Sequence, residues 1–272
     1  MFRIGLSTCG KPFDEALFRG YRQAGIDVME VSLDKEGCDA FDFRQARRLS
    51  AAYEVPLWSF HLPFMPFEQI DISHPALAGK TVPYLSEMIR RGGQIGIEKF
   101  IIHPSGEPIA EADRDARLST AMESLAALAR VAAENGAVMA VENLPRTCLG
   151  RDSSDILRLL AADPRLRVCF DTNHLLRETH GDFVKAVGEK IVTTHVSDYD
   201  FIDEKHWLPG EGKVDWPTLT QLLKNAGYGG VWLYEVGFKA PRSRPRSRDL
   251  TCEDFVRNAR EIFGGFPITA VE

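Results

Sequence analysis

AVMAVEN, at residues 137–143, is a short apolar run that ends in a carboxylate, Glu142. Short runs of this kind, rich in Val, Ile, Phe and Trp, are typical of buried parallel strands. If the strands are parallel, the residues that end them lie together at one edge, and in a closed (β/α)₈ barrel that edge carries the active site. Five further runs in the chain end in the same way, at His61, His103, Asp171, His195 and Glu235.

Strand-like and helix-like segments alternate along the whole chain. Apolar residues recur at spacings of three and four in stretches such as 14–25 and 118–136, which indicates helices with one buried face. Eight such alternations predict an α/β fold, a single (β/α)₈ TIM barrel that forms one domain over residues 1–272. A doubly wound sheet is the alternative, but segment 7–11 is not a glycine-rich dinucleotide-binding turn. The expected strands are residues 2–7, 26–31, 55–60, 99–103, 137–142, 167–171, 190–196 and 230–235.

Composition describes an ordinary globular protein with a large core, since 44% of the 272 residues are hydrophobic and 26% are charged. The formal net charge of −6 argues against a nucleic-acid partner, which would require a basic surface. One basic segment, 241–248, contains four arginines. We expect it to be a solvated loop after the last strand; the alternative is a phosphate clamp over the barrel mouth.

The chain has five scattered cysteines and no CxxC motif, which favours free thiols in a reducing compartment. No run approaches the roughly 20 apolar residues of a membrane span, and the first residues lack a long apolar segment. We therefore expect a cytoplasmic protein without a membrane partner. A homo-oligomer stays open.

Four residues at strand ends form the strongest candidate site, because three carboxylates and one imidazole suit a divalent cation. The absence of a thiolate from this set speaks against a structural zinc cage. Each acid could instead cap the helix after its strand, but four at matched positions favour a metal site. The predicted ligands of Mn²⁺, Co²⁺, Mg²⁺ or Zn²⁺ are Glu142, Asp171, His195 and Glu235.

Four other histidines are predicted to line the site and bind substrate. His61 and His103 each end a strand, and His174 follows Asp171 by three residues. His206 reaches the mouth only if the loop at 197–217 folds inward. The glycine-containing motif GEGKVDW, at 210–216, is interpreted as holding the mouth closed, and Asn143 is expected to orient Glu142 or cap a helix.

Several of these motifs carry a resemblance to a known family. FHLP, IIHPSG, VENL, FDTNH, THVSD, GEGKVDW and YEV occur in this order, and the chain resembles the sugar phosphate isomerase/epimerase family, the xylose-isomerase-like barrels. The resemblance implies that Glu142, Asp171, His195 and Glu235 hold one divalent metal. It also implies that the two glutamates exchange substrate protons, as in keto-sugar epimerases of the family.

The sequence therefore predicts a metal-dependent isomerase or epimerase acting on a small sugar, sugar phosphate or cyclitol ketone, with Glu142 and Glu235 as catalytic residues. A dehydratase of the same barrel family is an alternative. The chain also resembles zinc-dependent apurinic endonucleases, whose larger metal set would include all four histidines. That resemblance departs at Glu204-Lys205-His206, where those enzymes have Asp-x-His. A non-enzymatic sensor is a third alternative.

Overall fold

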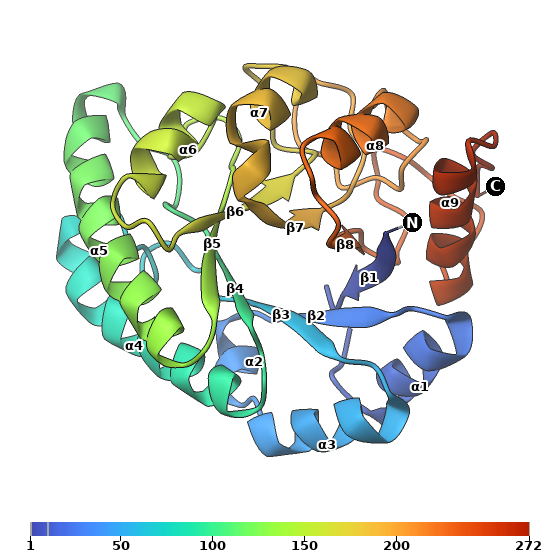
Figure 1. The fold of residues 1–272 in the computed structure, drawn as a ribbon, viewed down its shortest axis with the longest axis horizontal. Helices are drawn as coiled ribbons and strands as arrows, with labels where there is room; N and C mark the ends of the chain where they lie inside the picture. Colours follow the sequence, from blue (N-terminus) through green and yellow to red (C-terminus); the bar gives the residue numbers. More distant parts are fainter. Residues whose placement is uncertain (1, 10, 272) are drawn as a thin grey trace.

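The computed structural model describes residues 2–9 and 11–271, so the termini and Gly10 of segment 7–11 lie outside the description. Eight parallel strands form one sheet in the order β7-β6-β5-β4-β3-β2-β1-β8, which curls into a nearly closed barrel (Figure 1). The predicted fold class is confirmed. The strands are β1 (Arg3–Ser7), β2 (Val28–Ser32), β3 (Leu57–His61), β4 (Lys99–Ile102), β5 (Val138–Glu142), β6 (Arg167–Asp171), β7 (Ile191–His195) and β8 (Val231–Tyr234).

Helices surround the strands on the outside of the barrel (Figure 1). Asp14, Asp42 and Asp152 each cap a helix by accepting a backbone N–H of its first turn, and Gly25 ends the first helix with a φ of 87°. The helices are α1 (Glu15–Ala24), α2 (Lys35–Asp39), α3 (Phe43–Tyr53), α4 (Pro75–Gln94), α5 (Arg114–Glu134), α6 (Ser153–Leu160), α7 (His180–Val187), α8 (Trp216–Asn225) and α9 (Cys252–Gly264).

The seam between β7 and β8 closes the barrel differently from the other strand pairs. Val196 forms a bridge with Tyr234, and its N–H donates to the Leu233 carbonyl at 2.8 Å. The hydroxyl of Thr194 donates to the Val231 carbonyl at 2.9 Å. A side chain thus contributes a hydrogen bond at a position where neighbouring strands ordinarily pair through their backbones.

The interior of the barrel is filled by side chains below the strand ends. Trp58 packs against a small cluster of Val28, Val231 and Leu233, and its indole N–H donates across the barrel to Thr193 Oγ1 at 3.1 Å. The guanidinium of Arg3 lies over the same ring, 4.8 Å from its centroid. These side chains fill the barrel interior, so polar groups gather at the C-terminal ends of the strands.

The main hydrophobic core lies between the barrel and the surrounding helices, and it includes residues from nearly every element. The five cysteines are free thiols in the structure. In the described part of the chain, no helix is both long and apolar enough to cross a membrane.

Candidate active site

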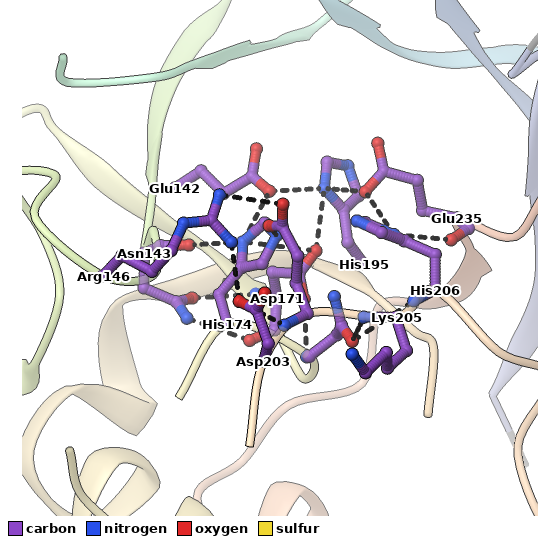
Figure 2. A network of polar contacts seen from close by, with 12 residues as sticks. Glu142, Asn143, Arg146, Asp171, His174, His195, Asp203, Lys205, His206 and Glu235 are labelled. Atoms are coloured by element: carbon purple, nitrogen blue, oxygen red, sulfur yellow. Dashed lines mark hydrogen bonds and ion pairs between the residues drawn. The ribbon is translucent and has the colours of Figure 1, made fainter. Parts of the chain in front are cut away.

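Four side chains converge at the C-terminal ends of adjacent strands (Figure 2). Glu142, Asp171 and His195 are the last residues of β5, β6 and β7, and Glu235 follows β8. His195 Nδ1 lies 3.1 Å from Glu142 Oε1, 3.5 Å from Glu235 Oε2 and 4.0 Å from Asp171 Oδ2. One ligand atom from each residue lies within 4.8 Å of the others. The structure thus brings together all four residues that the sequence predicted as metal ligands.

Asp171 supplies an oxygen with no partner in this cluster. Its Oδ1 accepts the Asn173 N–H at 2.6 Å, whereas the buried Oδ2 has no hydrogen-bond partner among the described residues. Burial raises the pKa of Asp171 to about 7. A buried acid with a free oxygen beside two other carboxylates fits a cation, which would offset the cost of burying these charges.

The pKa of Glu142 shifts in the opposite direction from that of Asp171. Burial alone would raise its pKa, but the imidazoles of His195 and His103 outweigh that effect and hold it well below the usual range. The Glu142 carboxylate is therefore ionised at neutral pH. Cys169 also lies near these groups, and with Glu142 and His195 it forms another group that could hold a metal ion; burial raises the pKa of its thiol well above the usual value.

Asn143 fixes the end of β6 beside Glu142. Its side-chain N–H donates to the Asp171 carbonyl at 2.9 Å, and its Oδ1 accepts the Asp171 N–H at 2.8 Å. Both of its polar atoms bond to the Asp171 backbone, so Asn143 ties the end of β5 to β6 and does not cap a helix; any orienting effect on Glu142 acts through this backbone link.

His61 and His103 both approach the Glu142 carboxylate. Their Nε2 atoms lie 3.1 Å and 3.3 Å from Glu142 Oε2, and His61 Nδ1 donates to the Leu62 carbonyl at 2.9 Å. His61 is buried below the mouth, whereas the ring of His103 stacks on Phe64 and borders the cavity. With Glu142, the two histidines form a second group that could hold a metal ion.

His174 and His206 meet on the other side of the site. The loop after β7 folds inward, so that His206 Nδ1 donates to the Glu235 carbonyl at 3.2 Å. His174 Nε2 lies 3.2 Å from Glu204 Oε2. Burial lowers the pKa of His174, but Asp171 and Glu204 outweigh it and raise the value to about 10. His174, Glu204 and His206 form a third candidate group of metal ligands.

A cavity with two lobes opens onto these residues. The first lobe, about 260 Å³, is lined by His103, Arg146 and Glu204 among others. The second lobe, about 410 Å³, is lined by Cys9 and residues after β2. Cavities of this order suit a small molecule. Four residues border both lobes, and they are Phe64, Met65, His206 and Glu235.

Arg146 is the one basic side chain, apart from histidines, that lines either lobe in the described part of the chain. Its guanidinium is bound by Asp203 at 2.7 Å (Figure 2). Glu204, at 2.9 Å, and Glu107 bind it as well. Sequence reasoning missed this cluster because its members come from three separate loops. The only local signal is the Arg that follows the VENLP segment.

The loop that carries His206 is supported by a buried aspartate. Asp198 accepts the Gly210 N–H at 2.8 Å, the Val214 N–H at 3.1 Å and the Trp216 indole N–H at 2.9 Å. The GEGKVDW motif therefore turns around Asp198, and its residues line neither lobe of the cavity. The motif therefore supports the loop that carries His206, and the interpretation that it holds the mouth closed was wrong.

The basic segment 241–248 is not simply a solvated loop. The Arg246 side chain is only 1% exposed and binds both oxygens of Glu211 at 2.7 Å. Arg248 binds Asp254 in α9. These two arginines anchor the loop to the rest of the protein. The expectation of a solvated segment was wrong for Arg246, whereas Arg248 remains exposed.

Comparison with known proteins identifies the family. The chain matches the family model of the xylose isomerase-like TIM barrels over residues 18–252 and belongs to that family. An uncharacterised protein of Mycobacterium leprae is 23% identical over 273 residues, covering 93% of this chain and 95% of that protein. A protein of Methanocaldococcus jannaschii is 25% identical over 212 residues, covering 74% and 70% of the two chains.

Solved structures show the same fold at low sequence identity. A D-psicose 3-epimerase superposes with a TM-score of 0.78 and 15% identity, covering 97% of this chain and 100% of that one. A D-tagatose 3-epimerase-like protein gives 0.74 and 20%, covering 85% and 89%. The 3-keto-D-glucoside 4-epimerase of E. coli gives 0.73 and 16%, covering 97% and 98%. The resemblance to this barrel family is thus confirmed.

Proposed function

We propose that the protein is a divalent-metal-dependent isomerase or epimerase that transfers a proton next to the carbonyl of a small polyhydroxylated ketone. The observation that carries the proposal is the placement of Glu142 and Glu235 beside the same nitrogen of His195, Nδ1, where both face one cavity. Family membership and the sugar epimerases among the structural neighbours support it.

The donor set fits a single divalent cation held by Glu142, Asp171, His195 and Glu235. Such a cation supplies Lewis-acid stabilisation of negative charge on substrate oxygens. The metal could be Mn²⁺, Co²⁺, Mg²⁺ or Zn²⁺, since oxygen and imidazole donors accept each of them.

The two glutamates would exchange the proton. The pKa of each lies below its usual value: burial opposes the effect, but His195 outweighs it at both residues. Both are therefore ionised at neutral pH, and either can accept a proton from the carbon next to the carbonyl. The other glutamate, protonated from solvent, returns a proton to the substrate, and the first glutamate then releases the proton it took to solvent. His103, His174 and His206 would bind substrate hydroxyls. Burial lowers the pKa of His103, so its neutral imidazole can both donate and accept, whereas His174, with its pKa raised to about 10, can only donate.

The charges around the cavity favour an uncharged substrate over a phosphate ester. Arg146 is already bound by Glu107, Asp203 and Glu204. Arg246 is bound by Glu211, away from both lobes. A phosphate group would enter a cavity rich in carboxylates in which, among the described residues, the one arginine is already paired, and this is unfavourable.

The test is solvent-deuterium exchange into ketoses and inososes, with and without a chelator. Glu142→Gln and Glu235→Gln should each keep the fold but abolish exchange, because the amide keeps the size of the side chain but cannot take a proton. Glu98→Gln, at an exposed position beside β4, is the matched control and should exchange at the wild-type rate. Wild-type exchange in either site variant refutes the role of that glutamate. Net loss of water from the substrate would instead identify a dehydratase.

A second candidate function, a zinc-dependent phosphodiesterase resembling apurinic endonucleases, is favoured by one observation. Five groups of potential ligands, several of them overlapping, occur among the described residues, and three of them share Glu142. The net charge of −6 opposes binding to DNA. Elemental analysis separates the two functions: one tightly bound metal per chain supports the isomerase. Three metals together with nicking of an abasic oligonucleotide would replace it with the nuclease.

A further inference from the structure

A carboxylate that is not among the four candidate ligands lies directly behind His195. Glu30 is in the middle of β2 and fully buried. Its Oε2 accepts the Ser59 hydroxyl of β3 at 2.7 Å. His195 Nε2 lies 3.2 Å from Oε2 and 3.1 Å from Oε1. Both hydrogen bonds of Glu30, with Ser59 and with His195, are made by Oε2, and Oε1 has no hydrogen-bond partner among the described residues.

The two ring nitrogens of His195 therefore face different surroundings. Nδ1 points to Glu142 and Glu235, whereas Nε2 points to Glu30 on the opposite side of the ring. Because a carboxylate only accepts hydrogen bonds, Nε2 carries a proton and donates it to Glu30. When one nitrogen of an imidazole is held as a donor, the lone pair of the other is directed at the metal position.

We propose that Glu30, held in place by Ser59, is a positioning residue that fixes His195 in the orientation in which Nδ1 binds the divalent cation. The inference rests on the metal centre proposed above. Its sequence signal is a single carboxylate within the otherwise apolar strand VMEVS. Such an acid is costly to bury unless it has a specific partner.

The first measurement is the affinity for Mn²⁺, determined by competition with a chelator. Glu30→Gln keeps the size of the side chain but removes its charge, and we expect roughly 10- to 100-fold weaker binding. Ser59→Ala should weaken binding in the same direction but less, and it carries the test if Glu30→Gln does not fold. Thr193→Val is the matched control, because Thr193 is buried on the same strand as His195 but binds Trp58. This control should keep the wild-type affinity.

The second measurement is the NMR signal of the His195 Nε2 proton in the Zn²⁺-loaded protein. In the wild type and in Thr193→Val this proton should be held in a hydrogen bond and exchange slowly with water. In Glu30→Gln its resonance should shift and its exchange should be faster. A purely structural role would lower thermal stability without this selective change.

The two measurements separate the possible failures. If wild type binds no divalent cation, the proposed metal centre itself is wrong. If wild type binds Mn²⁺ and Glu30→Gln matches Thr193→Val in affinity, the inference about Glu30 is overturned while the proposed function stands. Weaker binding with an unchanged Nε2 proton would also overturn it, because Glu30 would then act only through its charge.

Discussion

The Glu142 carboxylate contacts three imidazoles of the site. Its Oε1 lies 3.1 Å from His195, and its Oε2 lies near both His61 and His103. A carboxylate with imidazoles on both oxygens has one fixed orientation, which a proton-transfer group requires. A change at either His61 or His103 therefore acts on Glu142, and a change at His103 also acts on the cavity that it lines.

A change at His103 separates substrate binding from metal binding. We expect His103→Ala to keep one metal per chain and to raise KM up to about tenfold, the effect of losing one hydrogen bond. Metal content and steady-state kinetics check this expectation. His74→Ala is the control, since His74 caps α4 outside both lobes of the cavity. Loss of a metal ion from His103→Ala would show a multinuclear site and favour the nuclease alternative.

The loop between β7 and α8 depends on how closely Gly212 approaches the buried Asp198. A Cβ at Gly212 would lie 2.3 Å from Asp198 Oδ1 and 2.3 Å from the Tyr199 carbonyl. Neither atom is the flexible end of a long side chain, so the backbone itself would have to move. The same loop presents Glu204 and His206 to the cavity.

We therefore expect Gly212→Ala to lower the free energy of unfolding by about 1–3 kcal/mol, the range for inserting an atom into packed structure. Denaturant unfolding measures the loss. Gly229→Ala is the matched control, because a Cβ there meets no atom within 4 Å. Equal stability of the two variants would contradict the packing argument.

Helix α9 depends on the buried carboxylate of Asp254. It accepts the Thr251 N–H at 2.8 Å in a capping box and also binds Arg248 and Arg257. The hydrogen bonds from Arg248 are the main cause that holds the pKa of Asp254 well below its usual value. A lowered folded-state pKa adds stability above the unfolded value, and this stability is lost as pH falls through the folded value.

Asp254→Asn should accordingly cost about 1–2 kcal/mol at pH 7, the range for a cap with partly exposed ion pairs. The difference from wild type should be smaller at pH 3, which lies below the unfolded pKa of about 3.9. Unfolding curves at both pH values test this expectation. Glu253→Gln, exposed on the same helix, should show little change at either pH. An equal difference at pH 7 and pH 3 would refute the assignment.

At the scale of the whole molecule, the positions of the strands and the residues that end them could be predicted from the sequence. Each strand is a buried apolar run, so its position and the residue at its end, such as Glu142 or Asp171, follow from local composition. The side chains facing the barrel interior were harder to predict, because a register shift at Met29/Glu30 alters the pairing of β2 with β3. Arg146 and Arg246 could not be predicted because their partners come from loops distant in sequence.

The seam between β7 and β8 has a mechanical consequence for the closed barrel. His195 ends β7 on one side of the seam, and Glu235 follows β8 on the other. A cation bound by both would therefore bridge the two neighbouring strands that share the fewest backbone pairings. We expect the amides of Val196 and Glu235, which bond across the seam, to exchange more slowly with deuterium when Mn²⁺ is present, and chelation should reverse the effect. Amides between β3 and β4, which lie opposite the seam and carry none of the four proposed ligands, serve as the internal reference. Equal slowing in both places would mean that the ion stabilises the barrel as a whole. Slowing at the seam alone would mean that the same ion that serves the proposed reaction also holds β7 against β8 and so keeps the barrel closed.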